Sequence, residues 1–554
     1  MRRSGLTLVL VAAVLLSGCA ALPIEGAVRI GPDLSAPLGT ESFYYSPSSP
    51  VSGANEVDVL NGFLAAGTGP QNDYSVAREY LSESLRASWN PNQEVLIQRS
   101  APEIFMLEEG KAQVAIDLSA RIGPDGVYAT VAPGTQVLLD FQLAKESGEW
   151  RIVSAPDATV IIRPVFDVIF RSYSIHFLDR AQKHLVPELR WFALTPATGT
   201  RLVNALLRGP SPWLKPAVVS AIPSGTRLSI DAVTVENGTA LVDLTARALV
   251  ATRADRSLMK AQLAATLSQL PSVQKVAISI ERSRQDIPDQ QPPLNVEGSA
   301  PLVALSGDAL DVVAGSELEI PNSNSSFFSQ LKASGIAISR STGWLAALAP
   351  AGIYRSRYDE LGSTVELVDP RSQQLNPTYD KEGFLWTITK AQGSEIRVTS
   401  SGGDRITISA PWAVNRSIRS FSISPEGTRV VLVTEQPLGP ELLISAIVRD
   451  RAGNPISLTE PLSVSEITNP KSVQFIDNNT VAIVNEVESL GSVQLLTLGG
   501  LSRTLVSIPG ASEVFAGGQS GALHLLTSSG EVYIYRGQSW TLSLDGVQSL
   551  AVAR

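Results

Sequence analysis

The residue with the most evident chemistry is Cys19, because it is the only cysteine in a chain of 554 residues. It ends the stretch LSGC at 16–19, after two arginines and an apolar run at 6–16. Such a run is too short for a settled transmembrane helix and is typical of a secretory signal. A branched aliphatic residue, two small residues and a cysteine form the lipobox of prolipoproteins. We therefore expect cleavage between Gly18 and Cys19, and a mature Cys19 carrying S-diacylglycerol and N-palmitoyl groups. An ordinary signal with an accidental cysteine is the alternative.

Motifs of the common enzyme classes are missing from the sequence. It has no HExxH, GxSxG or GxxxxGK[ST] motif, no EF-hand loop and no pair of CxxC motifs. Two Ser-x-x-Lys matches, Ser257 to Lys260 and Ser329 to Lys332, have the spacing of penicillin-interacting serine enzymes. Neither is accompanied by SDN or KTG, so we interpret both as coincidence. The sequence predicts no catalytic residue and no enzyme.

Acidic residues and histidines leave two weaker possibilities. Glycosidases need two carboxylates about 5–10 Å apart, but Asp125, Glu426 and Asp477 each adjoin Gly or Asn in predicted turns. Turn formation and solvation account for acidic residues in such places. His176 and His184 could share one helical face as metal ligands, yet no third ligand is evident. We favour packing or surface roles for both, and predict no metal and no cofactor.

Charge and cysteine usage restrict the partners. The formal net charge is −9, and removal of Arg2 and Arg3 with the signal would make it about −11. An acidic surface repels phosphate backbones, so nucleic acid is not an expected partner. No disulfide framework is available. No later apolar run approaches the roughly 18 residues that cross a bilayer, so the lipid on Cys19 is the expected anchor, on the extracytoplasmic face of the cell membrane.

Apolar periodicity and linker composition divide the chain into seven segments. A helix at 56–67 ending at Gly67, a helix at 74–89 and a meander of strands predict an α+β domain. The order α-β-β-β-α-β predicts a second domain with one layer of sheet and helices on one face. The expected segments are a signal peptide at 1–18, the lipidated cysteine and flexible tether at 19–54, an α+β domain at 55–156, a structured bridge at 157–194, the second α+β domain at 195–283, a proline-rich linker at 284–297, and an all-β domain at 298–554.

The last segment repeats a turn followed by an apolar strand. The turn-to-strand positions fall at 308, 344, 385, 428, 480 and 522. A period near 40 residues is typical of propeller blades with four strands. We predict about six blades, with five or seven still open and a pair of β-sandwiches as the alternative. Four tryptophans in this segment would suit sugar or peptide recognition if exposed, namely Trp344, Trp386, Trp412 and Trp540. The apolar strands around Trp344 and Trp386 favour burial between blades.

Several stretches occur in an order that resembles the LpqB lipoprotein family of high-GC Gram-positive bacteria. They are CAALPIEGAV after the lipobox, GFLAAG with DYSVAREYLSESLRASWNP, IPSGTRL with VTVENGTALVDLT, and SISPEGTRVVLV with IVRDRAGNPISLTEP. The resemblance implies a nuclear-transport-factor-like cone at 55–156, a GerMN domain at 195–283 and the LpqB propeller at 298–554. Ser82 stands where the family pattern suggests Thr.

The resemblance also implies a function. Family members are associated with the MtrB sensor kinase and MtrA response regulator, so the expected partner is the extracellular domain of an MtrB-like kinase. The expected role is regulatory, bearing on cell-wall homeostasis and division. No residue that contacts the kinase is carried over from the family. A cell-wall glycan or small-ligand binder is the alternative, and a propeller glycan hydrolase is a third.

Overall fold

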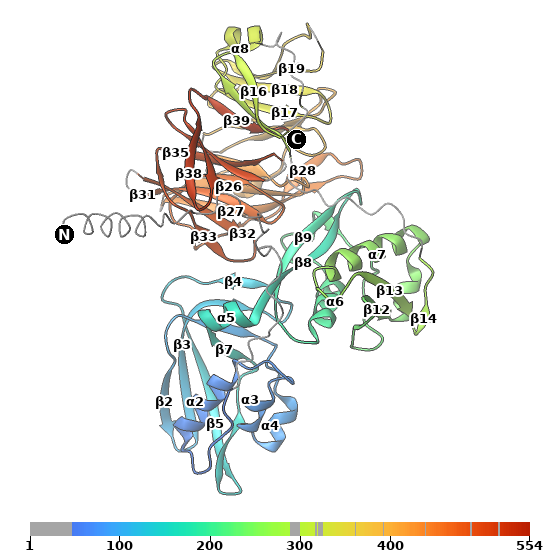
Figure 1. The fold of residues 1–554 in the computed structure, drawn as a ribbon, viewed down its shortest axis with the longest axis vertical. Helices are drawn as coiled ribbons and strands as arrows, with labels where there is room; N and C mark the ends of the chain where they lie inside the picture. Colours follow the sequence, from blue (N-terminus) through green and yellow to red (C-terminus); the bar gives the residue numbers. More distant parts are fainter. Residues whose placement is uncertain are drawn as a thin grey trace, which may run out of the picture. The chain divides into compact units, whose positions relative to one another are not determined.

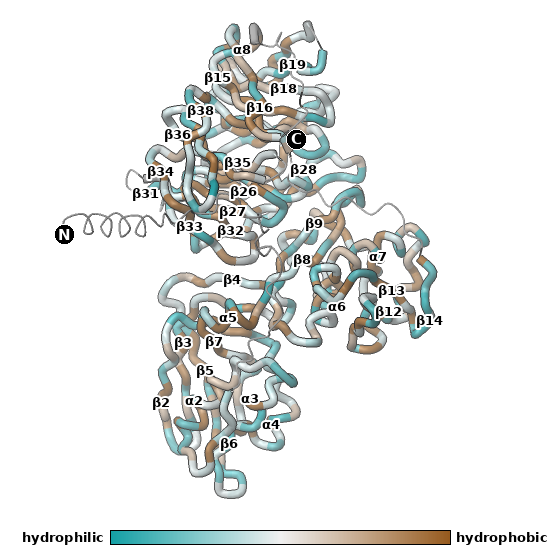
Figure 2. Tube along the Cα trace, in the orientation of Figure 1, coloured by the Kyte–Doolittle hydropathy of each residue, from teal (hydrophilic) through white to brown (hydrophobic). Residues whose placement is uncertain are grey.

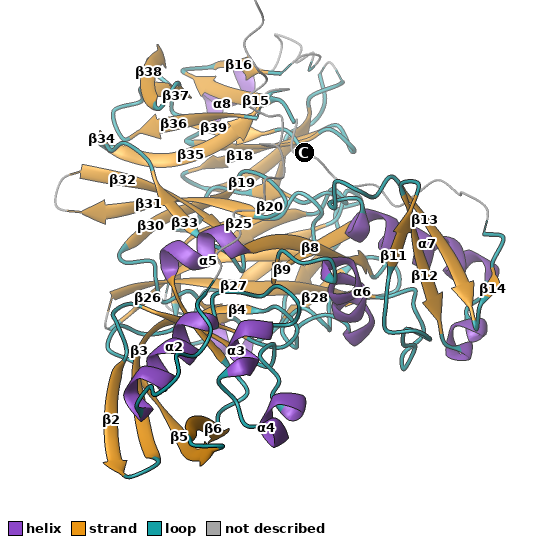
Figure 3. Cartoon of the chain, turned by 60° about the horizontal axis from the view of Figure 1, so that its bottom comes forward, coloured by secondary structure: helices purple, strands orange, loops and turns teal. Residues whose placement is uncertain are grey.

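The computed structural model describes residues 47–287 and 300–554, except 316–317, 319–324, 361, 392, 438, 488–489 and 519–520. Gly18 and Cys19, the signal, most of the tether and most of the proline-rich linker lie outside the described residues. Within the described part of the chain, no helix has both the length and the apolar character needed to span a membrane. Figure 1 shows the order of the elements, and Figure 3 shows that strands dominate the C-terminal segment.

The first domain places three helices against a seven-stranded sheet. The helices are α2 (Glu56–Ala66), α3 (Ser75–Glu79) and α4 (Glu83–Ser88). The sheet has the order β6-β5-β3-β1-β7, with β2 and β4 also paired to β3. Its strands are β1 (Val95–Gln98), β2 (Glu103–Glu108), β3 (Lys111–Ile122), β4 (Tyr128–Thr130), β5 (Gln136–Glu146), β6 (Glu149–Ser154) and β7 (Thr159–Ile162). Asn55 caps α2 by accepting a hydrogen bond from the backbone N–H of Asp58.

The predicted single helix at 74–89 is wrong, because the chain breaks it at 80–82. There the backbone of Tyr80 and Ser82 exchanges hydrogen bonds with Ile152 of β6. Ser82 then starts α4 by accepting from the N–H of Leu85. A contact with the sheet and a new N-cap thus interrupt the helix for three residues. The end of the predicted tether is also ordered, since Ser52 and Gly53 donate hydrogen bonds to Glu149.

The predicted bridge at 157–194 is divided between its two neighbours. Strand β7 joins the first sheet in parallel with β1. After α5 (Arg163–Ile169), strands β8 (Phe170–Asp179) and β9 (Leu185–Ala193) form a long hairpin that pairs with β10 (Val218–Val219). Helix α7 contacts β8, so the hairpin shares the core of the second domain.

The second domain therefore has two sheets instead of the predicted single layer. The helices are α6 (Thr198–Arg208) and α7 (Arg253–Leu267), and both contact β8. The second sheet has the order β11-β12-β13-β14, in which β12 and β13 are parallel. Its strands are β11 (Thr234–Glu236), β12 (Thr239–Leu244), β13 (Lys275–Ile280) and β14 (Ser283–Arg284). Thr252 and Asp255 form a capping box at the start of α7.

The C-terminal segment forms six sheets, which confirms the predicted propeller of about six blades. Each predicted turn-to-strand position lies at a hairpin or strand start of a different sheet. The first and last strands of the propeller segment close the ring, because β39 (Ser549–Val552) pairs with β15 (Leu302–Ser306), which also pairs with β16 (Ala309–Ala314). The short helix α8 (Ser325–Leu331) follows β16.

The other five sheets each use consecutive strands. They are β17 (Gly335–Ser339), β18 (Trp344–Ala349), β19 (Gly352–Arg357) and β20 (Glu366–Asp369); β21 (Thr378–Tyr379), β22 (Leu385–Ile388), β23 (Ile396–Thr399) and β24 (Arg405–Thr407); β25 (Ser417–Ile423), β26 (Arg429–Gln436), β27 (Gly439–Arg449), β28 (Pro455–Leu458) and β29 (Leu462–Ser463); β30 (Pro470–Phe475), β31 (Thr480–Val487), β32 (Leu490–Thr497), β33 (Ser502–Thr504) and β34 (Ile508–Pro509); and β35 (Ala511–Gly517), β36 (Ala522–Thr527), β37 (Val532–Arg536) and β38 (Ser539–Leu544). Figure 2 shows hydrophobic residues along β26 and β27, and both strands are largely buried.

Candidate functional site

A candidate binding site on the axis of the propeller is a pocket of about 340 Å³. A strand at one end of each of the six sheets contributes to its lining, from β17, β21, β25, β30, β35 and β39 or the residues beside them. This arrangement is what a propeller produces, because the first strand of each blade faces the central channel. The channel is thus the place where residues far apart in sequence converge.

Basic side chains dominate the charge of this channel. Lys390, Arg419, Lys471 and Arg554 line it, and Glu513 is the one acidic side chain among the lining residues. Arg419 also forms an ion pair with Glu435. Burial raises the pKa of Glu513 to about 7, although Lys390 and Lys471 act in the opposite direction. In a chain of net charge −9, this channel is a local excess of positive charge suited to an anionic ligand. Sequence analysis missed it because single basic residues in separate repeats carry no local signal.

The interior of the first domain offers little space for a ligand. The pocket found there measures about 10 Å³ and is lined by aromatic side chains that include Phe63, Trp89 and Phe141. Phe63 packs against both other rings, with centroid distances of 5.2 Å to Trp89 and 6.0 Å to Phe141. A space of this size is close to the volume of one water-sized probe. The aromatic side chains therefore fill the interior of the first domain at this place, and the space left there is too small for a ligand.

The two histidines weighed as metal ligands lie in different surroundings. His176 is buried on β8, and burial lowers its pKa to about 4. The predicted packing role fits this position. His184 lies at the end of the turn between β8 and β9, with Nδ1 3.6 Å from Asp179 Oδ2. The two histidines share a hairpin and no helical face, so the helical arrangement considered for them is wrong.

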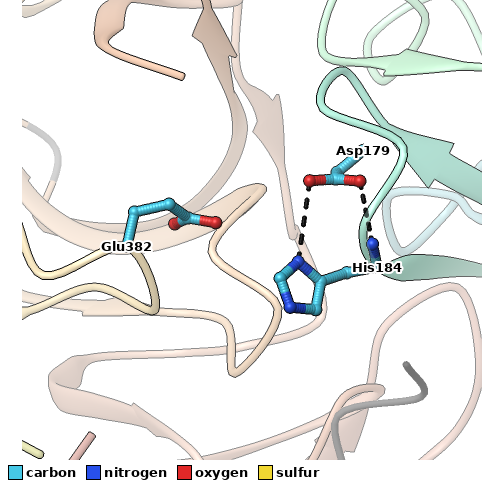
Figure 4. Close-up of side chains that lie close together, drawn as sticks. All are labelled: Asp179, His184 and Glu382. Atoms are coloured by element: carbon cyan, nitrogen blue, oxygen red, sulfur yellow. Dashed lines mark hydrogen bonds and ion pairs between the residues drawn. The ribbon is translucent and has the colours of Figure 1, made fainter. Parts of the chain in front are cut away.

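A third ligand for His184, which sequence analysis did not find, comes from the propeller. Glu382 lies in the loop between β21 and β22, and one ligand atom from each of Asp179, His184 and Glu382 lies within 4.8 Å of the others. Figure 4 shows Glu382 reaching toward the two residues of the hairpin. No sequence spacing could have indicated this, because Glu382 belongs to another domain.

The pKa values of the two carboxylates in this cluster are shifted in opposite directions. Burial raises the pKa of Asp179, but the nearby ring of His184 and the backbone N–H groups of Lys183 and His184, which donate to Asp179 Oδ1, outweigh burial and hold that pKa below its usual value. Burial raises the pKa of Glu382, and Asp380 adds to the effect while Arg449 opposes it. The cluster thus brings the buried carboxylate of Asp179 close to the carboxylate of the exposed residue Glu382.

The acidic residues assigned to turns divide into two groups. Asp477 accepts hydrogen bonds from the N–H groups of Asn479 and Thr480, and Asp125 lies in the turn before β4, as predicted. Glu426 also lies in a turn, as predicted, but its predicted solvation is wrong, because its side chain is buried and ion-paired with Arg429 at 2.8 Å. The nearby Arg429 allows this burial by neutralising the charge.

The four propeller tryptophans are held by the blades. Trp386 is buried and donates a hydrogen bond to Asp380 at 2.8 Å. Trp344 is half-buried beneath the guanidinium of Arg355, 4.2 Å from its ring centroid. The indole N–H groups of Trp412 and Trp540 donate to the carbonyls of Thr459 and Val506. These contacts support the structural interpretation over sugar recognition.

The Ser-x-x-Lys matches also lie in structural positions. Ser257 lies in α7, and its hydroxyl donates to the carbonyl of Arg253 in the same helix. Lys260 Nζ donates to the carbonyl of Ile287. Ser329 belongs to the short helix α8. These contacts agree with the interpretation of both matches as coincidence.

Family models match three successive parts of the chain. A model of the N-terminal domain of lipoprotein LpqB matches residues 49–167, and a model described as sporulation and spore germination, Germane, matches residues 174–286. A model of the LpqB β-propeller domain matches residues 302–550. The second match includes most of β8 and all of β9, in agreement with their place in the second domain.

Curated relatives extend this similarity along the chain. Lipoprotein LpqB of Cutibacterium acnes is 26% identical over 534 residues, covering 90% of this chain and 86% of that protein. Lipoprotein LpqB of Nocardia farcinica is also 26% identical, covering 87% and 85%. Lipoprotein LpqB of Thermobifida fusca is 31% identical over 290 residues, about half of each chain, 50% and 46%.

Solved structures resemble parts of the chain only distantly. A chain from the nidogen/laminin complex aligns with 46% of this chain and 99% of its own length, at 12% identity and a TM-score of 0.33. The first GerMN domain of the sporulation protein GerM from Bacillus subtilis aligns with 23% and 94%, at 16% identity and a TM-score of 0.17. Neither similarity bears on function.

Proposed function

Because the chain belongs to the LpqB lipoprotein family, we propose that it is a lipid-anchored accessory of a two-component sensor kinase. The kinase is of the MtrB type, paired with an MtrA-type response regulator, and the output bears on cell-wall homeostasis and division. The observation that carries the proposal is the ordered match of three family models along the chain. The protein acts by binding and not by catalysis.

The anchor in this proposal is Cys19, modified by diacylglycerol and palmitate after the signal peptide is removed. Anchoring confines the protein to a thin layer on the extracytoplasmic face of the cell membrane. That confinement raises its effective concentration beside a kinase ectodomain. Tighter binding to one conformation of the kinase than to another then biases signalling, by no more than the difference in affinity.

Calorimetric titration tests the partner directly. Residues 20–554, without the lipidated cysteine, are titrated with the purified extracellular domain of the MtrB-type kinase from the same organism. Saturable binding supports the proposal. Absence of heat at high micromolar concentrations, with both proteins shown to be folded by circular dichroism, would contradict it.

The basic channel supports a second candidate function, the binding of a small anionic ligand from the cell wall. The supporting observation is the convergence of Lys390 and Lys471 on a pocket of about 340 Å³. Muropeptides with free carboxylates are suitable probes, because their acid groups match the charge of the channel. Binding that is lost in Lys390→Gln/Lys471→Gln protein would support this function. Equal binding by the wild-type and double-variant proteins would contradict it.

A further inference from the structure

The turn of the β8–β9 hairpin brings a histidine and an aspartate against a loop of the propeller. Asp179 ends β8, His184 immediately precedes β9, and Glu382 extends from the loop between β21 and β22 (Figure 4). One ligand atom from each lies within 4.8 Å of the other two. Two carboxylates and one imidazole from two domains thus converge on one small volume.

His184 has an unused coordination atom in this cluster. Its side chain is 9% exposed, and its buried Nδ1 has no hydrogen-bond partner among the residues that the structure describes. The Asp179 oxygen at 3.6 Å is beyond normal hydrogen-bond length. A buried ring nitrogen without a partner costs free energy. The cost is avoided when a donor or a metal ion binds its lone pair, or when an acceptor binds its N–H. The lone pair of a neutral imidazole is a common ligand of divalent metals.

The charged side chains around the cluster are not balanced, because carboxylates outnumber guanidinium groups. Arg449 of β27 bridges Asp380 Oδ2 at 2.7 Å and Glu382 Oε2 at 3.2 Å. Next to them, Arg429 pairs with Glu426, and Arg554 interacts with both Glu426 and Asp380. Four carboxylates, those of Asp179, Asp380, Glu382 and Glu426, therefore face three guanidinium groups. The carboxylates thus outnumber the guanidinium groups by one, beside the buried Asp179 and His184 and the exposed Glu382.

We propose that Asp179, His184 and Glu382 bind a divalent cation of the Zn²⁺ or Mn²⁺ class, which fastens the hairpin of the second domain to the propeller. One nitrogen and two oxygen donors suit these ions, and three protein ligands leave positions for water. Mg²⁺ and Ca²⁺ suit the site poorly, because they prefer shells made of oxygen alone. Arg449 holds Glu382 from the side and orients its carboxylate. This inference does not depend on the proposed kinase partner.

The ions themselves are the probes in the test. Tag-free protein covering residues 20–554 is treated with chelator, dialysed and titrated with ZnCl₂ or MnCl₂ by calorimetry. The expected result is one ion per chain for at least one of the two metals, and a melting temperature that rises with its concentration. MgCl₂ and CaCl₂ should give no comparable binding. Absence of binding by both Zn²⁺ and Mn²⁺ would overturn the proposal.

Variants separate this site from adventitious binding. Glu382→Gln keeps the size of the side chain but removes its negative charge. It should weaken binding of the ion by at least about tenfold. His184→Gln should have a similar effect. His176→Gln and His524→Gln change the other two histidines of the chain and should bind the ion as the wild type does. Equal binding by wild-type and Glu382→Gln protein, both shown to be folded, would overturn the assignment even if His184→Gln failed to fold.

Discussion

Arg429 of β26 donates a hydrogen bond from Nη1 to the backbone carbonyl of Pro187 in β9, at 3.1 Å, across 242 positions of sequence. Its Nε also pairs with the buried carboxylate of Glu426 at 2.8 Å. The same side chain therefore neutralises a charge within its blade and contacts the hairpin of the second domain. Trp191 makes a second such contact, from its indole N–H to the carbonyl of Gly499 at 2.9 Å.

Replacing Arg429 by Met should destabilise the protein strongly. The change removes the ion-pair partner of the buried Glu426, which keeps its interaction with Arg554. Removing one partner of a buried ion pair typically costs about 3–5 kcal/mol. Urea denaturation followed by tryptophan fluorescence measures the effect. The double variant Arg429→Met/Glu426→Leu should recover much of the loss, because it removes the unpaired charge. A cost below about 1 kcal/mol in the single variant would show that water reaches Glu426.

His176 should make the protein sensitive to acid. Its folded pKa is about 4, below the ordinary value of 6.5, so the unfolded chain binds a proton more readily than the folded one. The contribution of the neutral His176 to the free energy of unfolding is therefore fully present above pH 6.5. It is lost as the pH falls toward 4, by up to about 3 kcal/mol. His176→Leu should lose about 2–3 kcal/mol less than the wild type between pH 7 and pH 4.5. Parallel losses in both proteins, measured by urea denaturation, would contradict this.

Anion binding in the channel should depend on Glu513. Because its folded pKa is about 7, the side chain is mostly ionised at pH 8 and mostly neutral at pH 6. Lowering the pH therefore removes the negative charge that faces Lys390 and Lys471. Sulfate, which does not titrate in this range, should bind several-fold more tightly at pH 6 in calorimetry. Glu513→Gln should bind equally at both values, and a pH dependence that persists in this variant would refute the assignment.

Closure of the ring should depend on Leu550. This residue is buried on β39 opposite Ala304 of β15. Leu550→Asp therefore places an unpaired charge between the first and last strands of the propeller segment. We expect a loss of several kcal/mol and a lower melting temperature. Leu542→Asp on β38 is the matched control, since that side chain is exposed. Similar melting temperatures for the two variants would show that closure contributes little.

The anchor should reside in Cys19 alone. Cys19→Ala should move the protein from the membrane fraction to the soluble fraction without changing its folded circular dichroism spectrum. Immunoblots of fractionated cells measure the distribution. A Cys19→Ala protein that stayed at the membrane and supported normal kinase output would disprove lipid anchoring at this residue.

The predicted elements held best where periodicity was long. The spacing of the blade turns predicted about six blades, and the order α-β-β-β-α-β predicted two helices in the second domain, which the structure confirms as α6 and α7. The helix at 74–89 was wrong because Ile152, distant in sequence, hydrogen-bonds to the backbone of Tyr80 and Ser82. Local patterns contain no information about such a partner.

The sequence by itself determined the division into two α+β domains and a propeller of about six blades, and it predicts a lipobox at Cys19. These features depend on residues that are near one another in sequence, because the spacing of apolar residues indicates helices and strands. Only the tertiary structure decided that Glu426 is buried with Arg429, that single basic residues of separate repeats share one channel, and that Glu382 meets Asp179 and His184. Each of these depends on contacts between distant residues, where burial and neighbouring charges set the chemistry of a side chain.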